Sequence, residues 1–570
     1  LATAASTTPA STAKSNKALL DMLVKNGVIN QKQYVELEKA GGDFSSDALL
    51  SVLVQNGAVT KDQASTLAKG QAVPGAPAVA AAGAASAKDA PKQDSFVHLN
   101  EKGLEFGSND GNFKMKIGGR LQVDSMIAYN PNSGSAATGG APMDTQLSSG
   151  VTLRRARLYT EGVFWHDYEY RFEYDFARNW GGTSGITDAY VKYIRFAPFS
   201  VTIGQQNEGK SMESVMSNNY LTFIERGLPN NAFIEQSSNS KYQMGITAQM
   251  FDKAWGVPYV FNGGLTTMSL GYPTMNTAPG ATSGNNCYNT GNTNGGSGCQ
   301  ENNQNGWSGN ATYQLVGRGV ILPYKDDEGN LVHVGAWGSG RTLTNTLNSD
   351  GTIRNGGWQF ASQPDTNVDR TNYVNTYNMS KVVGGKTYLA QHVNMFGAEL
   401  AGAWGPFHTT TEYMWANVLG QNYSGNNAVQ GFSTNVGWFV TGETRPYDDK
   451  KGTWNRVVPK SNFTTGSGGW GAVEVAARYD LIDLNSRSGL ITGGAMDIGT
   501  LGVNWYLTPR VRLMTNWVHV FAVNNGNSPY STPGQKSSCY NSTANSGSPG
   551  IGCYNGVTPN VWETAVRVDF

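Results

Sequence analysis

The chain has 570 residues, of which 39% are hydrophobic, 11% are aromatic and 71 are glycine. Its 42 basic and 42 acidic residues balance, so a strong electrostatic preference for nucleic acid is not expected. No run of about 18 apolar residues occurs, which excludes a helical membrane span, but strands that alternate apolar and polar residues escape that test. The first residues, 1–5, look like the start of a mature chain whose export signal has been removed.

Residues 18–34 and 48–64 form an internal repeat. Each copy reads as a short helix that ends at an Asn-Gly pair, followed by a second helix that Asn30 or Thr60 caps. We therefore predict a small α-helical domain in residues 1–70, located in the periplasm. A trimerisation or cell-wall-contact role and a plain spacer role remain open alternatives. Residues 71–95 are rich in Ala, Pro and Gly and predict a linker.

Residues 168–176 alternate strictly, with an aromatic residue at every even position and a charged one at every odd position. A period of two indicates a β-strand, and strands of about ten alternating residues are typical of a transmembrane β-barrel. Residues 96–570 therefore predict an all-β, 16-stranded antiparallel barrel, apolar toward lipid and polar toward the lumen. The predicted strands are 113–129, 151–165, 168–176, 186–196, 199–207, 241–251, 256–270, 307–320, 331–340, 391–404, 407–419, 431–443, 470–483, 493–507, 510–523 and 561–570.

The connections between these strands alternate in length. Those after the second, fourth, sixth, tenth and fourteenth strands are tight, whereas those after the first, fifth, seventh, ninth and fifteenth are long and polar. Short periplasmic turns and long outside loops are the rule in outer-membrane barrels. The connection from Glu443 to Gly469 is an exception, because it is long on the side of the short turns.

The four cysteines form two close pairs within long loops, Cys287 with Cys299 and Cys539 with Cys553. A metal site would need histidines or closer cysteine spacing, so we expect no metal and two loop-closing disulfides. Each disulfide is expected to stabilise the protein by about 2–4 kcal/mol. Non-reducing peptide mapping should recover these two pairs. Swapped pairs, or free thiols in protein taken from the native membrane, would contradict the predicted loops.

The six histidines are scattered without the spacing of a catalytic triad or a metal site. We therefore predict no catalytic residue, no cofactor and no enzymatic activity.

Several fragments, in one order along residues 100–570, resemble the phosphate-selective porin O and P family. This resemblance implies a sixteen-stranded trimeric porin whose third outside loop folds inward and narrows the pore. It also accounts for the long link after the twelfth strand. The fragments are Leu153–Leu158, Tyr170–Phe176, Asp188–Tyr193, Glu225–Gly227, Thr441–Tyr447, Arg456–Pro459, Gly502–Leu507 and Arg510–Leu513.

A pore selects by its diameter and by the charges at its narrowest part, where Arg and Lys favour anions. Arginine suits phosphate because its planar fork offers paired donors to two oxygens. Alternation directs Arg155 and Arg157 toward the lumen, and directs Arg154 outward unless a bulge turns it inward. The predicted pore-lining, anion-selective residues are Lys116, Arg120, Arg154, Arg155, Arg157, Arg171, Lys210 and Arg226.

Two features argue for moderate selectivity. The arginines have an alternative role, in which they only pair with Glu161, Glu169 and Glu173 in the wall. The third loop, 208–240, is net acidic, and 218–220 occupies the place where phosphate-selective relatives have a lysine.

We therefore expect an outer-membrane porin through which small hydrophilic solutes diffuse passively, with a moderate preference for phosphate or other inorganic anions. The expected partners are two further copies in a homotrimer, outer-membrane lipid and lipopolysaccharide. The alternative is a non-selective general-diffusion porin whose N-terminal module tethers the envelope.

Overall fold

The computed structural model describes residues 95–100, 103–130, 147–178, 185–235, 241–267, 312–343, 346–347, 353–355, 358–466, 468–525 and 554–570. The predicted helical repeat, the linker up to residue 94 and all four cysteines lie outside these residues. Among the described residues, no helix is long and apolar enough to cross a membrane.

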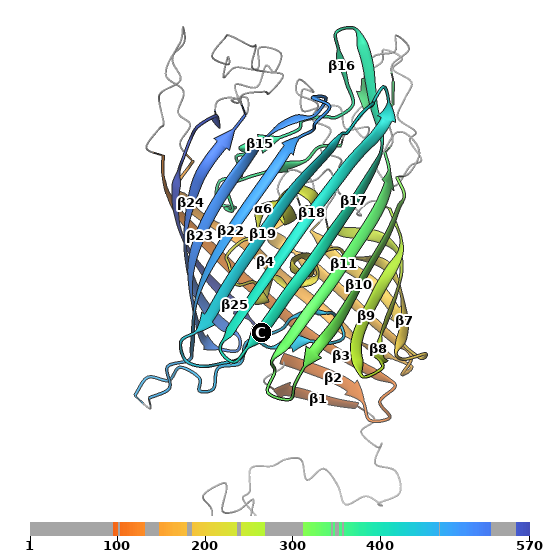
Figure 1. Ribbon diagram of the computed structural model, residues 1–570. Helices are drawn as coiled ribbons and strands as arrows, with labels where there is room; N and C mark the ends of the chain where they lie inside the picture. The colour runs from red at the N-terminus through yellow and green to blue at the C-terminus, as the bar shows by residue number, and fades with distance from the viewer. Residues whose placement is uncertain are drawn as a thin grey trace, which may run out of the picture. The chain divides into compact units, whose positions relative to one another are not determined.

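Sixteen antiparallel strands form a closed barrel, as the sequence predicted (Figure 1). The last strand pairs with the first, from Asn560 opposite Tyr129 to Asp569 opposite Arg120, which closes the barrel. The strands are β3 (Phe113–Tyr129), β4 (Gly150–Phe164), β5 (Tyr168–Asp175), β6 (Ile186–Tyr193), β7 (Phe199–Asn207), β8 (Tyr242–Ala254), β9 (Val257–Thr266), β10 (Gln314–Lys325), β11 (Leu331–Thr342), β17 (Lys386–Trp404), β18 (Phe407–Gln421), β19 (Ala428–Phe439), β22 (Ala472–Asn485), β23 (Thr492–Thr508), β24 (Val511–Asn524) and β25 (Asn560–Asp569).

The two ends of the barrel differ in their connections. At one end, which we call the turn end, most connections are short, such as residues 165–167 and 405–406. The exception is the link of residues 440–471, which contains β20 (Tyr447–Asp448) and β21 (Thr453–Trp454). The opposite end is called the loop end. It carries the third loop, residues 208–241, and the fifth loop, residues 343–385.

Both of these loops contain short elements of their own. In the third loop they are α5 (Met212–Val215), η2 (Asn218–Tyr220), α6 (Leu228–Asn230) and η3 (Asn231–Glu235). In the fifth loop they are β12 (Thr346–Leu347), β13 (Ile353–Asn355), β14 (Ala361–Ser362), β15 (Val374–Asn375) and β16 (Lys381–Val383). A further short helix, η1 (Phe176–Arg178), follows β5.

A hairpin that the sequence did not predict extends the sheet at the turn end. It consists of β1 (Ser95–Asn100) and β2 (Gly103–Ser108), and β2 pairs with β3 from Leu104 opposite Ile117 to Gly107 opposite Lys114. The hairpin therefore continues the edge of β3 beyond the point where β25 ends.

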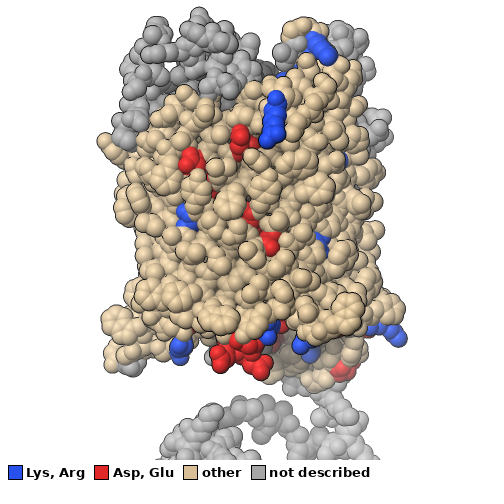
Figure 2. All heavy atoms as spheres, viewed as in Figure 1, with Lys and Arg blue, Asp and Glu red and all other residues tan. Residues whose placement is uncertain are grey.

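Alternation fixes which side chains face outward. On β3 and β25, Ile127 is 70% exposed and Trp562 is 58% exposed, whereas the inward Gln122 and Glu563 are buried. The outer wall in Figure 2 carries few charged side chains over the strands, and charges gather at the turn end. This arrangement is the one that a barrel in lipid requires.

The lumen is not polar throughout, which differs from the sequence prediction. At the loop end, inward side chains of β17, β18, β19 and β22 to β25 form an apolar core with the third and fifth loops. Val393 and Val418 of the wall pack in one cluster with Phe233 of the third loop and Phe360 of the fifth. Because these loops fold inward and exclude water, apolar side chains are stable on the inner face of this part of the wall.

Candidate functional site

A cavity of about 460 Å³ lies inside the barrel against the wall from β3 to β9. Its other walls are residues 215–220 of the third loop and two cations of the 440–471 link, Lys451 and Arg456. The cavity therefore lies where strands, the third loop and the link approach one another.

Cationic side chains outnumber acidic ones around the cavity. Eight cationic and five acidic residues line it, together with neutral amides such as Asn218 and Asn219. The cationic residues are Lys116, Arg120, Arg157, Arg171, Lys192, Lys241, Lys451 and Arg456, and the acidic residues are Glu161, Glu173, Asp188, Glu208 and Asp569.

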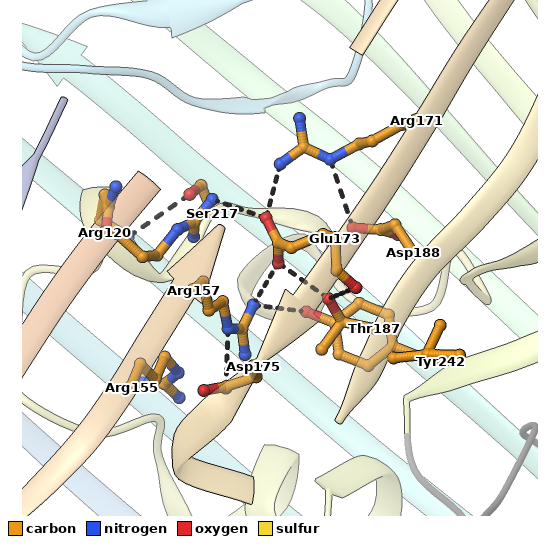
Figure 3. Close-up of polar contacts among 12 residues, drawn as sticks. Arg120, Arg155, Arg157, Arg171, Glu173, Asp175, Thr187, Asp188, Ser217 and Tyr242 are labelled. Atoms are coloured by element: carbon orange, nitrogen blue, oxygen red, sulfur yellow. Dashed lines mark hydrogen bonds and ion pairs between the residues drawn. The ribbon is translucent and has the colours of Figure 1, made fainter. Parts of the chain in front are cut away.

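The carboxylate of Glu173 is the centre of a buried network of arginines (Figure 3). Its oxygens lie 3.2 Å from a guanidinium nitrogen of Arg120, 2.7 Å from one of Arg157 and 2.6 Å from one of Arg171. The register of the strands produces this cluster, because Arg157 lies opposite Asp175 and Glu161 lies opposite Arg171.

Further carboxylates complete the network. The Nε atom of Arg157 donates to Asp175 at 2.8 Å, and Arg171 contacts both Glu161 and Asp188. The sequence left open that these arginines pair with carboxylates of the wall. In the structure they do form such pairs, and Glu161 and Glu173 are among their partners. Four of the eight cations at the cavity have carboxylates at hydrogen-bond distance and are largely neutralised by them: Arg120, Arg157 and Arg171 in this network, and Arg456, which donates to Asp569.

The third loop crosses the lumen and is held by the opposite wall. Five of its backbone carbonyls, all within residues 220–225, accept hydrogen bonds from side chains of the wall or the link. The pairs are Tyr220 with Arg445, Leu221 with Arg512, Thr222 with Asn504, Ile224 with Arg567 and Glu225 with Arg478. These donors come from the link and from β24, β23, β25 and β22. Residues 220–225 of the loop are therefore fixed to the opposite wall.

A β-bulge on β4 determines where Arg154 lies. Gln122 of β3 is opposite Arg155, but the next residue, Val123, is opposite Leu153, so Arg154 is the extra residue. Its guanidinium turns inward and donates to the Glu225 carboxylate of the third loop at 3.0 Å. Arg155 donates to the amide oxygen of Gln122 at 2.8 Å and has no acidic partner within 4 Å among the described residues.

A model of the family described as phosphate-selective porin O and P matches residues 118–533, which is most of the chain. The chain belongs to this family. As a member of this family, this porin is a non-enzymatic β-barrel channel of the bacterial outer membrane.

Two curated relatives support the assignment of this porin. It is 23% identical over 433 residues to Porin O of Pseudomonas aeruginosa, which covers 74% of this chain and 86% of that protein. It is 26% identical over 445 residues to a protein of Caulobacter vibrioides described as uncharacterized, with 78% of this chain and 76% of that protein covered.

Solved porin structures are also similar to this porin. An anion-selective porin from Comamonas acidovorans has 11% identity and a TM-score of 0.39, with 80% of this chain and all of that chain covered (100%). Outer-membrane expressed OmpT of Vibrio cholerae has 10% identity and a TM-score of 0.40, with 80% and 98% covered.

The eight predicted selectivity residues of this porin fall into two groups. Lys116, Arg120, Arg157 and Arg171 line the cavity. Arg154, Arg155, Lys210 and Arg226 are not among its lining residues.

Lys210 and Arg226 lie within the third loop and hold it together. The ammonium group of Lys210 lies 3.0 Å from Glu208, and burial lowers the pKa of Lys210 to about 8 against the opposing effect of that carboxylate. Arg226 lies 2.7 Å from Glu235 and donates to the backbone carbonyls of Glu213 and Met216. Both cations are buried. Their contacts are with the loop and the adjoining wall.

Four cavity-lining cations of this porin were not predicted. The sequence does indicate that Lys192 faces the lumen, because alternation along β6 places it on the same face as Asp188 and Tyr190. Lys241 closes the third loop. Lys451 and Arg456 lie in the 440–471 link, where no periodic pattern indicates which side chains face the lumen.

Proposed function

We propose that this porin lets small hydrophilic solutes diffuse passively across the outer membrane and prefers anions moderately, with phosphate or other inorganic anions among its solutes. The excess of cationic over acidic residues around the cavity carries the proposal. An anion that enters a narrow passage loses part of its water and needs fixed donors. Lys116 and Lys192 supply such donors on the strand wall.

The preference is moderate because much of the positive charge is already neutralised. Arg120, Arg157 and Arg171 share Glu173, and Arg157 and Arg171 have further carboxylate partners. A permeating anion must therefore compete with fixed carboxylates at these arginines. Lys192 instead donates to the amide oxygen of Gln249 at 3.1 Å.

The proposal includes the assembly. We propose a homotrimer in contact with lipid and lipopolysaccharide, with the turn end in the periplasm. The first barrel strand begins and the last one ends at the turn end. We further propose that residues 1–70 form a helical module in the periplasm, joined by the linker 71–95 and able to contact the cell wall. Sedimentation of the detergent-solubilised protein should give three chains per particle, and a monomer would contradict the trimer.

Removal of the two strand lysines tests the anion preference. The double variant Lys116→Gln with Lys192→Gln keeps a polar, hydrogen-bonding side chain of similar length at each position but removes two charges. Charge pairs that remain in contact with water contribute about 0.2–1 kcal/mol, which is a factor of about 1.4 to 5, so the anion-to-cation permeability ratio should fall by about that factor for each lysine. The measurement is the reversal potential across a planar bilayer under a potassium chloride gradient.

Lys253→Gln is the matched control, because Lys253 is exposed near the end of β8 and does not line the cavity. Its reversal potential should equal that of the unmodified porin. An unchanged reversal potential in the double variant, with normal conductance, would favour a general-diffusion porin. Absence of conductance in the unmodified porin would favour the tethering role.

A further inference from the structure

The lining of the cavity is divided into a charged part and a neutral part. Strands β3 to β6 contribute five of its cationic residues and three of its acidic ones. Among the described lining residues, strands β7 to β9 contribute none that is charged. They supply hydroxyl and amide side chains instead, which we call the neutral patch: Thr202, Gln206, Asn207, Thr247, Gln249 and Asn262. Binding of an inorganic anion needs only the charged part, so the neutral patch has to be explained separately.

The register of the strands makes the neutral patch continuous and places a cation at its edge. Thr202 of β7 lies opposite Lys192 of β6 on one side and opposite Thr247 of β8 on the other. Gln249 of β8 lies opposite Asn262 of β9. Side chains of directly opposite residues are close enough to contact one another. A solute that meets the ammonium group of Lys192 with one end can therefore reach the neutral patch with the other.

The neutral patch offers both donors and acceptors. An amide side chain has two N–H donors, and a threonine hydroxyl both donates and accepts. The amide oxygen of Gln206 accepts from the hydroxyl of Thr247 at 2.7 Å, and that of Gln249 accepts from Lys192 at 3.1 Å. The amide nitrogens of Gln206 and Gln249 donate to backbone carbonyls at 3.4 Å and 2.7 Å. Each of these two amides thus keeps a second N–H for a solute, and hydroxyl groups are suitable partners for a surface of this kind.

The third loop adds an acceptor to the cavity. Asn218 lines the cavity and is 4% exposed, and its amide oxygen has no hydrogen-bond partner among the described residues. A buried acceptor without a donor is unfavourable. A chloride ion has no proton to donate, whereas a hydroxyl group of a solute has one. Asn218 therefore favours a solute that carries hydroxyl groups as well as a negative charge.

The size of the cavity agrees with an organic solute. Its volume of about 460 Å³ lies within the range of about 300–1,000 Å³ that is usual for sites of organic ligands. A water molecule takes up only about 30 Å³ of liquid. The cavity is thus larger than a single inorganic anion requires.

We propose that the cavity binds a hydroxylated organic anion, which is a small polyol or sugar that carries a carboxylate or a phosphate group. The negative head lies against Lys192, and the hydroxyl groups bond to the neutral patch and to Asn218. This site rests on the proposed function in that the cavity is the path of the solute. It adds to that function the body of the solute, which the neutral strands β7 to β9 recognise.

Four solutes test the proposed class with the unmodified porin in a planar bilayer. Gluconate carries a carboxylate and hydroxyl groups, hexanoate has the same carbon chain without hydroxyl groups, and glucitol has the hydroxyl groups without a charge. Gluconate should halve the chloride current at a concentration about tenfold lower than either of the others, because several hydrogen bonds contribute together. Equal half-blocking concentrations for gluconate and hexanoate would overturn the proposal. Glucose phosphate in the same assay shows whether a phosphate or a carboxylate is the preferred head.

A double variant tests the neutral patch itself. Thr202→Val with Thr247→Val keeps the shape of both side chains and removes their hydroxyl groups. The half-blocking concentration of gluconate should rise about fivefold for each hydroxyl that contacts the solute, whereas that of hexanoate should stay the same. The matched control is Thr411→Val with Thr434→Val. These two threonines also lie opposite each other, with their hydroxyl oxygens 2.8 Å apart, and do not line the cavity. Equal block by gluconate in the two double variants would contradict a role of the neutral patch.

Calorimetric titration of the detergent-solubilised porin with gluconate separates this proposal from the proposed function. Binding that the Thr202 and Thr247 substitutions weaken, in a porin without anion preference in potassium chloride, would refute the proposed function and leave the hydroxylated-anion site standing. Anion preference without tighter binding of gluconate than of hexanoate would do the reverse. Thermal unfolding checks the assembly of each variant. If the double variant does not assemble, the comparison of solutes with the unmodified porin still decides.

Discussion

Replacement of Glu173 by glutamine is expected to make the channel distinctly more anion-selective. Glu173 neutralises three arginines at once and is 1% exposed. Arg157 keeps Asp175 in the variant, and Arg171 keeps two carboxylates, so these side chains stay in place. Arg120 has no other acidic partner within 4 Å among the described residues, and it lines the cavity.

The variant therefore releases a cation at the solute path, and the reversal potential should move in the direction opposite to that of the lysine variants. The effect should weaken with salt, because the screening length is about 10 Å at 0.1 M and about 3 Å at 1 M. Inorganic phosphate should also block the chloride current more strongly than in the unmodified porin. The control is Asp252→Asn, which removes an exposed charge near the end of β8 that does not line the cavity. Equal reversal potentials in the two variants would show that Glu173 does not control the charge sensed by the solute.

Replacement of Arg478 by glutamine is expected to cause the largest loss of stability. This arginine of β22 faces three carboxylates, at 2.7 Å from Asp480, 3.9 Å from Glu213 of the third loop, and in direct contact with Asp365 of the fifth loop. It also donates to the carbonyl of Glu225. Loss of one partner of a buried ion pair costs about 3–5 kcal/mol because the remaining charges have no compensation.

Urea unfolding of the barrel in detergent or liposomes should show this loss at pH 8. Arg487→Gln, which changes an exposed arginine between β22 and β23, should unfold like the unmodified porin. A third-loop anchor of this kind also controls the width of the constriction, so the Arg478 variant should show a higher and noisier conductance. Equal stability of the two variants would contradict a role for Arg478 in anchoring the loops.

The same cluster predicts a pH dependence. Burial, with a contribution from Asp480, raises the pKa of Glu213 to about 7 and that of Asp365 well above its ordinary value, although Arg478 opposes both shifts. Arg226 of the third loop also opposes the shift of Glu213. A carboxyl with a raised pKa favours the folded state when it is protonated, so this contribution is complete below about pH 4.5 and is lost as the pH rises through about 7. The deficit of the Arg478 variant should therefore be smaller at pH 5 than at pH 8.

Much of the barrel could be predicted from the sequence because its strands follow a local rule. In lipid, the outward residues must be apolar and the backbone must pair between strands, so an alternation of period two marks each strand. This rule found all sixteen strands and turned Lys116 and Arg120 inward. The rule placed the ends of weakly alternating strands less accurately. For example, the strand predicted at 307–320 is β10, which runs from Gln314 to Lys325.

The pairing of the inward arginines was only partly predictable. Alternation put Arg157, Arg171 and Glu173 on the lumen face, but the register between β4 and β5 decided which of them meet. The bulge at Arg154 depends on how β3 and β4 pair and on the position of Glu225 in a distant loop. No local pattern of the sequence contains that information.

The sequence by itself determined the barrel, the number of its strands and the inward direction of Lys116, Arg120, Arg157 and Arg171, because each follows from the contact of a strand with lipid. Only the tertiary structure decided the shape and charge of the cavity. Arg512 holds the carbonyl of Leu221 across 291 residues, and Trp454 meets the third loop from a segment without periodicity. Contacts over such separations depend on how the closed barrel brings distant segments together, so they form only once the barrel has closed.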